Sequence, residues 1–225
     1  MSAVYFELDK AIEMGEPIVI RLYAIIEATE KLLEYIVSKI LNLYKRDDLI
    51  GAVYTSVKEL AINGTKANLK RILFDEENIK IDNNLEYERG MALFRKKLNE
   101  RFIKKYAAMG KKKGLKVEVI FKYSPKVFII EIINNAAITA KEDKRIRNNF
   151  QKAIGYDDIA QFYMEAGDST EGSGMGITLV TMLLKSSNLD PHGFTIYSDY
   201  AKKTCAKLEI PLSDEYQTSR EKFKK

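Results

Sequence analysis

The sequence predicts an α+β protein, a two-layer α/β sandwich with helices on one face of a mixed, mostly antiparallel sheet. Two pairs of apolar segments, 115–123 with 127–133 and 194–198 with 206–211, are rich in β-branched and aromatic residues and predict hairpins. Segments with helical periodicity precede and separate these pairs. Because a helix and a sheet each bury one apolar face, the helices are expected to form a layer against the sheet.

The first 48 residues are expected to be an addition to the main domain. Residues 4–8 and 18–23 favour strands, and a Gly-Glu-Pro turn signal separates them. Between Glu27 and Tyr44, apolar residues recur at spacings of three and four, which predicts an amphipathic helix. The sequence leaves open whether this region packs onto the domain or forms a dimer surface, so a homodimer is compatible with it.

The main domain is expected to span residues 49–212. Asp47 or Asp48 can cap a helix that continues towards Leu73. A charged segment predicts an inserted basic helix at about residues 83–110, and the glycines at 110 and 114 mark the turn that ends it.

After the first hairpin, residues 140–171 are polar with helical character and are expected to act as a lid. They run into a glycine-rich loop, which opens an apolar helix at about residues 177–184. The polar tail, residues 213–225, is expected to be flexible.

The composition excludes several classes of protein. Hydrophobic residues make up 46% of the chain, but no apolar run approaches the roughly 20 residues that cross a bilayer, and no signal peptide is evident. We therefore expect no membrane insertion and a cytoplasmic location. The lone cysteine, Cys205, can form neither an intramolecular disulfide nor a thiolate zinc site, which agrees with a reducing compartment.

Ten basic residues crowd the segment 95–116, although the net charge is only +5. Such a cluster could attract a polyanion. No series of aromatic residues accompanies the charges, so a solvated helix and turn is the favoured interpretation and nucleic acid is an unlikely partner.

One predicted helix carries a set of polar residues suited to phosphoryl transfer. Glu59, Asn63, Lys66 and Lys70 fall at positions i, i+4, i+7 and i+11 and so project from one side. A carboxylate can accept a proton, an amide oxygen can bind Mg²⁺, and a lysine can neutralise phosphate. Taken alone, the same spacing also describes an exposed polar helix face.

The glycine-rich loop is the second candidate feature. Gly172, Gly174 and Gly176 alternate just before a helix, which lets backbone N–H groups approach phosphate oxygens at a helix N-terminus. The spacing is neither that of a Walker loop nor that of a Rossmann fingerprint. A flexible linker is the alternative interpretation.

These motifs resemble, in order, those of the histidine kinase-like ATPase (GHKL) superfamily, whose ATP-binding domain has the Bergerat fold. Residues 58–67 are similar to its asparagine box, residues 172–177 to its second glycine box with Met175 in place of leucine, and residues 194–212 to its closing hairpin. The resemblance spans roughly residues 49–212. It implies ATP and Mg²⁺ as ligands.

The resemblance also implies roles for single residues. Glu59 would be the general base, Asn63 the magnesium ligand and Lys66 a phosphate contact. Asn134 and Asn135 would lie at the adenine, and Thr204 would support the nucleotide pocket. The triphosphate would be held by Gly172, Ser173, Gly174, Met175 and Gly176.

The first glycine box departs from the family pattern DxGxG. Asn134 stands at the position of the aspartate, and Ala136 and Ile138 stand at those of the glycines. An asparagine still offers the adenine amino group a carbonyl acceptor, but the charge-assisted hydrogen bond is lost.

Two functions follow from this resemblance. The first is a signalling kinase or ATPase that acts in trans on a protein partner, because the single histidine, His192, lies in a turn-rich link and is a poor phosphoacceptor. The second is a catalytically inactive nucleotide-sensing or protein-interaction module. Glu59 favours the enzyme, and the altered first glycine box favours the module.

Overall fold

The computed structural model describes residues 3–156, 159–166 and 175–222. Five strands form one sheet in the order β1 (Ile18–Leu22), β2 (Val117–Tyr123), β3 (Val127–Asn134), β5 (Thr204–Pro211) and β4 (Phe194–Ser198). The expected α+β class is confirmed. The expected mixed sheet is wrong, because every neighbouring pair of described strands is antiparallel.

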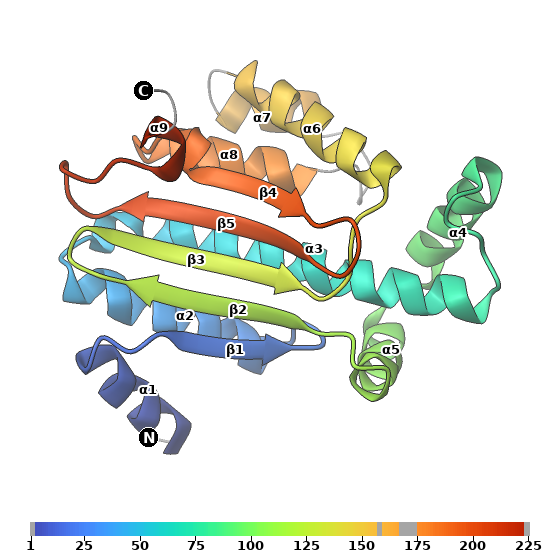
Figure 1. The fold of residues 1–225 in the computed structure, drawn as a ribbon, viewed down its shortest axis with the longest axis horizontal. Helices are drawn as coiled ribbons and strands as arrows, with labels where there is room; N and C mark the ends of the chain where they lie inside the picture. Colours follow the sequence, from blue (N-terminus) through green and yellow to red (C-terminus); the bar gives the residue numbers. More distant parts are fainter. Residues whose placement is uncertain (1–2, 157–158, 167–174, 223–225) are drawn as a thin grey trace.

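Helices form a second layer behind the sheet (Figure 1). This layer contains α2 (Glu27–Leu43), α3 (Ile50–Glu76) and α8 (Met175–Ser186), with α6 (Ala140–Ile154) and α7 (Ile159–Ala166) beside α8. Single-turn 3₁₀ helices cover Asp47–Leu49 and Pro191–Gly193. Alternate residues of the central strands point into the helical layer, as the side-chain period of two requires. The buried residues of β2 and β3 are Val117, Val119, Phe121, Phe128, Ile130, Ile132 and Asn134.

The N-terminal segment differs from the prediction. Residues 4–8 lie in helix α1 (Ala3–Glu13), whereas the expected strand at 18–23 and helix at 27–44 are confirmed as β1 and α2. Leu8 and Ile12, one helical turn apart, are buried in the main core, and this packing overrides the strand preference of the local sequence. Because β1 pairs with β2, the N-terminal region is part of the sheet.

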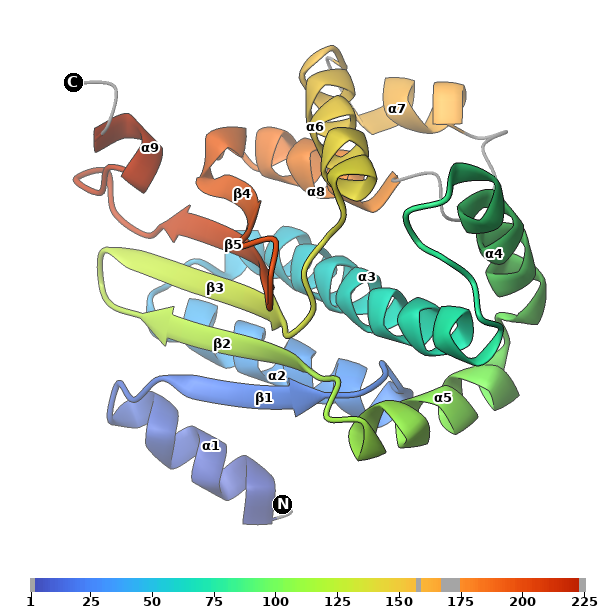
Figure 2. The same ribbon diagram turned by 45° about the vertical axis from the view of Figure 1, so that its right-hand side comes forward.

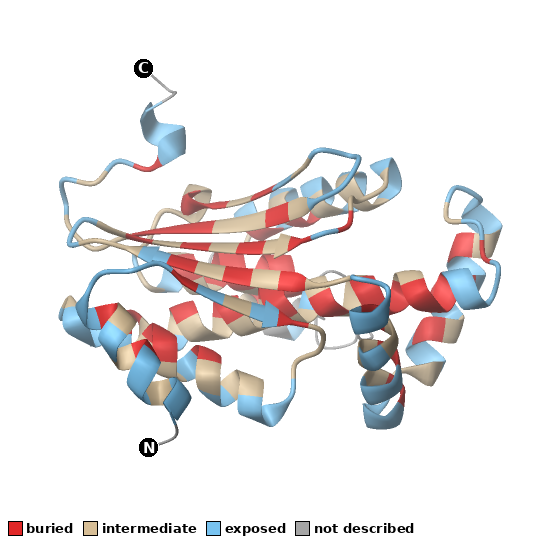
Figure 3. Cartoon of the chain, turned by 60° about the horizontal axis from the view of Figure 1, so that its bottom comes forward, coloured by how far each residue is buried: buried red, intermediate tan, exposed pale blue. Residues whose placement is uncertain are grey.

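The second half of α3 extends past the sheet and carries α4 (Asn84–Lys97) and α5 (Glu100–Lys112) (Figure 2). We call residues 84–112 the α4–α5 arm. The single helix expected at 83–110 is wrong, because the Asn99 side chain accepts a hydrogen bond from the Phe102 backbone and caps a new helix. Figure 3 shows buried residues continuing along α3 beyond the sheet, where the arm packs in two apolar clusters of its own.

The tail is attached to the sheet, at least through residue 222. Glu209 on β5 accepts hydrogen bonds from the Tyr216 hydroxyl and from the backbone and hydroxyl of Ser219, at the start of α9 (Ser219–Lys222). Thr218 is buried beside it. The expectation of a flexible tail was based on polarity, and it overlooked a buried carboxylate that needs polar partners.

No helix in the described part of the chain combines the length and the apolar character needed to span a bilayer. Cys205 is buried on β5 and is a free thiol.

Gly90→Ala tests the packing of the α4–α5 arm. A Cβ at Gly90 would lie 2.6 Å from the tip of the Phe74 ring and 3.0 Å from Ile79, and both side chains are buried. We expect a loss of about 1–2 kcal/mol in the free energy of unfolding, since overpacking exceeds the gain in helix propensity. Gly51→Ala in α3, with nothing within 4 Å, is the control and should be neutral or stabilising. Urea denaturation measures both variants, and equal stabilities would contradict the packing.

The anchor of the tail predicts a pH dependence. Burial alone would raise the pKa of Glu209, but hydrogen bonds from Lys207, Ser219 and Tyr216 outweigh it and lower the pKa from 4.5 to about 2. The ionised carboxylate therefore stabilises the fold at pH values above about 4.5, and this stabilisation is lost as the pH falls towards 2. Compared with Glu209→Gln, the wild type should be more stable at pH 7, and the difference should shrink below pH 4 in urea titrations. A difference that stays constant down to pH 2 would exclude this role.

Candidate functional site

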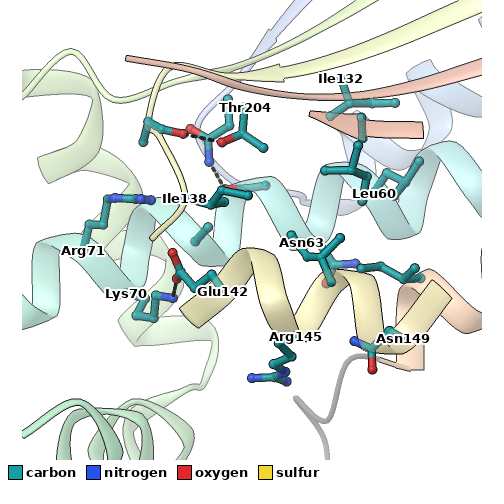
Figure 4. A pocket seen from close by; sticks show the side chains of 18 of the residues that line it. Leu60, Asn63, Lys70, Arg71, Ile132, Ile138, Glu142, Arg145, Asn149 and Thr204 are labelled. Atoms are coloured by element: carbon teal, nitrogen blue, oxygen red, sulfur yellow. Dashed lines mark hydrogen bonds and ion pairs between the residues drawn. The ribbon is translucent and has the colours of Figure 1, made fainter. Parts of the chain in front are cut away.

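A cavity of about 240 Å³ lies between α3, α6 and the ends of β3 and β5 (Figure 4). Its walls near the sheet are apolar, and its outer parts carry amide and charged side chains. The described residues that line it are Leu60, Asn63, Gly64, Ala67, Lys70, Arg71, Tyr87, Met91, Ile132, Asn134, Ala136, Ile138, Glu142, Arg145, Ile146, Asn149, Ile177, Ile196, Thr204 and Ala206. An apolar pocket with a few polar groups at defined places is typical of small-molecule sites.

The sheet side of the cavity has one hydrogen-bond acceptor without a partner. Asn134 is only 6% exposed, and its Nδ2 donates to the Gly64 carbonyl oxygen at 3.1 Å. Its Oδ1 is buried and has no partner within the described structure. Because a carbonyl can only accept, the contact with Gly64 assigns Nδ2 and leaves Oδ1 as the unsatisfied atom. A buried acceptor of this kind is costly unless a ligand or water supplies the donor.

The strand register brings Thr204 next to Asn134. The two residues are directly paired across β3 and β5, and the Thr204 hydroxyl donates to the Ala136 carbonyl at 2.9 Å. This hydrogen bond holds the chain where it leaves β3 and enters the loop to α6. Asn134, predicted to meet the adenine, and Thr204, predicted to support the nucleotide pocket, therefore lie together.

Helix α8 begins against Glu59 and Asn63. A Cβ placed on Gly176 would lie 2.4 Å from Glu59 Oε1 and 2.6 Å from Asn63 Nδ2, closer than any side chain permits. A side chain at position 176 would therefore displace the side chains of Glu59 and Asn63. A carboxylate and an amide from α3 thus meet the first turn of α8, where the helix dipole favours negative charge.

Helix α6 covers the side of the cavity that faces away from the sheet. A buried ion pair joins α6 to α3. Thr139 and Glu142 form a capping box at its N-terminus, and Glu142 also accepts a hydrogen bond from Lys70. The two side chains are 14% and 11% exposed. Burial would raise the pKa of Glu142, but Lys70 and the Thr139 backbone outweigh it and lower the pKa. Arg71 donates to the Ala137 carbonyl and holds the preceding loop.

The rest of α6 is fixed by the sheet and by α8. Arg147 donates to the Ile196 carbonyl at 2.8 Å, and the Tyr200 hydroxyl donates to Asp143 at 3.0 Å. Lys185 of α8 donates to carbonyls at the C-terminal end of α6, including that of Ile154 at 3.1 Å. The predicted polar lid is thus, over residues 140–154, an ordered helix with partners at both ends.

The predicted site residues divide into three groups. Asn63, Asn134 and Thr204 line the cavity, and Glu59 lies beside it at Gly176. Lys66 and Met175 are not among the lining residues. Gly172, Ser173 and Gly174 lie outside the described residues.

Asn135 has a role in the fold. Its Oδ1 accepts from the Lys116 backbone and its Nδ2 donates to the Gly114 carbonyl, both at 2.7 Å. The side chain therefore ties the end of β3 to the turn before β2 and points away from the cavity lining. Asn134 is the last residue of β3, whereas Asn135 lies just beyond the strand, and the two side chains take different directions.

The cavity residues contributed by α4 and α6 were not predicted from the sequence. Tyr87 and Met91 come from the inserted helix, and Glu142, Arg145 and Asn149 from α6. The Thr-x-x-Glu spacing at residues 139–142 was a usable signal for the start of α6. No comparable local signal shows that α4 folds back to the cavity.

No group of three or more His, Cys, Asp and Glu side chains with metal-binding geometry occurs among residues 3–156, 159–166 and 175–222. A magnesium ion held with only Asn63 from the protein would need oxygen ligands from phosphate and water, which is a common arrangement for Mg²⁺.

Comparison with known proteins finds one distinct similarity. An uncharacterized protein of Treponema pallidum (strain Nichols) is 28% identical to the chain over 217 residues. The match covers 96% of this chain but 42% of that protein, so the chain spans less than half of the relative's length. No family model and no solved structure matches the chain.

Lys70→Met tests the buried ion pair. It leaves the Glu142 carboxylate buried without its cation, so we expect a loss of about 3 kcal/mol in the free energy of unfolding at pH 7. Adding Glu142→Gln to Lys70→Met should recover part of this loss, because the uncompensated charge is removed. The control is Lys97→Met, which breaks an ion pair with Glu77 whose side chains are 40% and 36% exposed, and should cost less than about 1 kcal/mol. Urea denaturation measures the free energy of unfolding of each variant. Equal losses in Lys70→Met and Lys97→Met would show that the buried ion pair contributes no more to stability than the exposed one.

Proposed function

We propose that the chain is an ATP- and Mg²⁺-binding protein with the Bergerat arrangement, acting as a signalling kinase or ATPase on a partner protein. The observation that carries the proposal is Asn134, which lines a largely apolar cavity and whose buried Oδ1 has no partner among the described residues. The exocyclic amino group of adenine supplies the missing donor. The apolar side chains of Leu60, Ile132 and Ile177 suit the faces of a planar base.

The orientation of Asn134 favours adenine over guanine. Since Nδ2 is held by Gly64, the atom left for the base is an acceptor. Adenine presents an amino donor at its position 6, whereas guanine presents a second acceptor at the same position. With guanine, Asn134 Oδ1 and the oxygen at position 6 of the base would face each other without a proton between them. Two unpaired oxygens in a buried site strongly disfavour guanine relative to adenine.

The phosphate groups are assigned to the end of the site where α8 begins. The first turn of a helix attracts anions, and α8 begins in close contact with Glu59 and Asn63. Asn63 would supply an amide oxygen to Mg²⁺, and the bound ion would neutralise phosphate charge. Glu59, which is partly exposed, would accept the proton of an attacking hydroxyl or water.

The position of the only histidine supports action in trans. His192 lies in the Pro191–Gly193 turn before β4, where its Nδ1 is 2.8 Å from Asp190 Oδ1. It is not among the residues that line the cavity. The phosphoacceptor of a kinase reaction is therefore assigned to a signalling partner.

A catalytically inactive nucleotide-sensing or protein-interaction module is the second candidate. Asn134 binds adenine without the charge assistance that a carboxylate gives. In addition, Lys70 is neutralised by Glu142, and Lys66 does not line the cavity. These features reduce the positive charge offered to a triphosphate and favour binding without rapid turnover.

Calorimetric titration with MgATP and MgGTP tests the base contact. We expect the wild type to bind ATP at least about tenfold more tightly than GTP, and Asn134→Leu to lose about tenfold or more in ATP affinity because the acceptor is absent. Asn135→Ala is the matched control, because the Asn135 side chain bonds to the turn before β2 and does not line the cavity. This variant should keep the wild-type affinity for ATP. Equal affinities for ATP and GTP, or no binding at millimolar nucleotide, would refute the proposal.

The same samples separate enzyme from module. For the enzyme, phosphate release from ATP should be detectable in the wild type and should fall at least about a hundredfold in Glu59→Gln, while ATP affinity is retained. Asn63→Ala should weaken Mg²⁺-dependent binding. Tight binding without hydrolysis or transfer in the wild type would assign the module instead.

A further inference from the structure

We propose that Tyr87 and Lys141 make the α4–α5 arm a positioning element of the cavity, by holding the first turn of α6 in place. This turn carries Glu142 and Arg145 into the cavity lining, while Tyr87 and Met91 bring α4 into the same lining. Two segments far apart in the sequence thus meet at one end of the site. The contacts that join them are separate from those that join α6 to the sheet.

Tyr87 is the centre of these contacts. Its side chain is 5% exposed, and its ring packs edge-on against Phe74 of α3, so its position is fixed by the cluster inside the arm. Two ammonium groups lie over the ring, with Lys141 Nζ at 4.5 Å and Lys70 Nζ at 5.4 Å from its centre. A buried aromatic ring attracts cations through the negative charge of its π face.

Lys141 connects α6 to α4 directly. Its Nζ lies 2.8 Å from Glu88 Oε1 and 3.4 Å from Asn84 Oδ1, both on α4. The side chains of Lys141 and Glu88 are 44% and 64% exposed, so the ion pair alone would contribute little. The contact with the buried Tyr87 ring gives the lysine a fixed partner that the solvent does not replace.

Two lysines connect the first turn of α6 to its neighbours. Lys70 of α3 binds Glu142, and Lys141 of α6 binds the arm, while both contact Tyr87. Movement of α4 would therefore displace Tyr87, release Lys141 and disturb the environment of the buried Lys70–Glu142 pair. Tyr87 thus positions the cavity wall through these lysines.

The direction of the effect follows from preorganisation. A wall that is already in place costs less to order when a ligand enters the cavity. Loss of the contact should make the first turn of α6 move away from α4 more often. It should also weaken the binding of any ligand between α3 and α6. A partner that engages the arm would then change the affinity of the cavity without touching it. This last step rests on the proposed nucleotide function, but the positioning itself does not.

Hydrogen exchange of the 225-residue chain without ligand tests the positioning. In Lys141→Gln and Tyr87→Leu, amides of residues 142–148 should exchange about threefold to tenfold faster than in the wild type. Tyr87→Phe keeps the ring and removes only the hydroxyl, which accepts a long hydrogen bond of 3.5 Å from Lys70, so exchange should stay close to that of the wild type if the ring contacts position α6. Lys144→Gln removes the same charge from an exposed position of α6 that has no ion pair with the described residues, and it should leave exchange unchanged.

MgATP titration of the same variants gives the second measurement. We expect Lys141→Gln to raise the dissociation constant about threefold to tenfold and Lys144→Gln to leave it unaltered. If the wild type binds no nucleotide but Lys141→Gln still exchanges faster, the proposed function fails and the positioning role stands. Unchanged exchange in α6 for Lys141→Gln, or an equal increase in Lys144→Gln, overturns the positioning role even if ATP binds. Should Tyr87→Leu fail to fold, Lys141→Gln alone decides.

Discussion

The packing of α3 along the sheet is the contact on which the remaining structure depends. Gly64 makes this approach close, because a Cβ there would lie 3.1 Å from the Val117 side chain on β2. The same residue offers its carbonyl to Asn134, so one small residue sets both the distance between the layers and the orientation of the buried amide. The helix then continues past the sheet and gives the α4–α5 arm its apolar surface. Successive parts of α3 therefore pack against the sheet, line the cavity and support the α4–α5 arm.

The sequence predicted elements well where local pattern and tertiary packing agree. Both hairpins and the helices at α2, α3 and α8 follow from periodicity and turn residues, and the pairing of Asn134 with Thr204 brings two predicted site residues together. The N-terminal helix was misread because its apolar residues fit either period over such a short segment. Only the position of the core shows that Leu8 and Ile12 belong on one helical face.

The parts of the cavity that could not be predicted come from elements that meet only in three dimensions. Asn134 and Asn135 have identical side chains, yet the last residue of β3 lines the cavity and the residue after it is bonded to a turn. Tyr87 lies in a segment whose most evident property is charge, and its aromatic ring serves a wall made mostly by other helices. Polar residues within a continuous motif are therefore easier to assign than a single aromatic residue from an insertion.

The position of β1 at the edge of the sheet has a consequence for the order of folding. Its partner β2 is far away in the sequence, with Arg21 and Glu118 separated by 97 positions although their side chains bond. The central hairpin of β2 and β3 closes over a short loop, so its formation loses little chain entropy. Strand β1 can pair with β2 only after α2, α3 and the α4–α5 arm have been synthesised. During synthesis the apolar N-terminal strand thus leaves the ribosome long before its neighbour exists. This interval is a time when the growing chain would benefit from a chaperone.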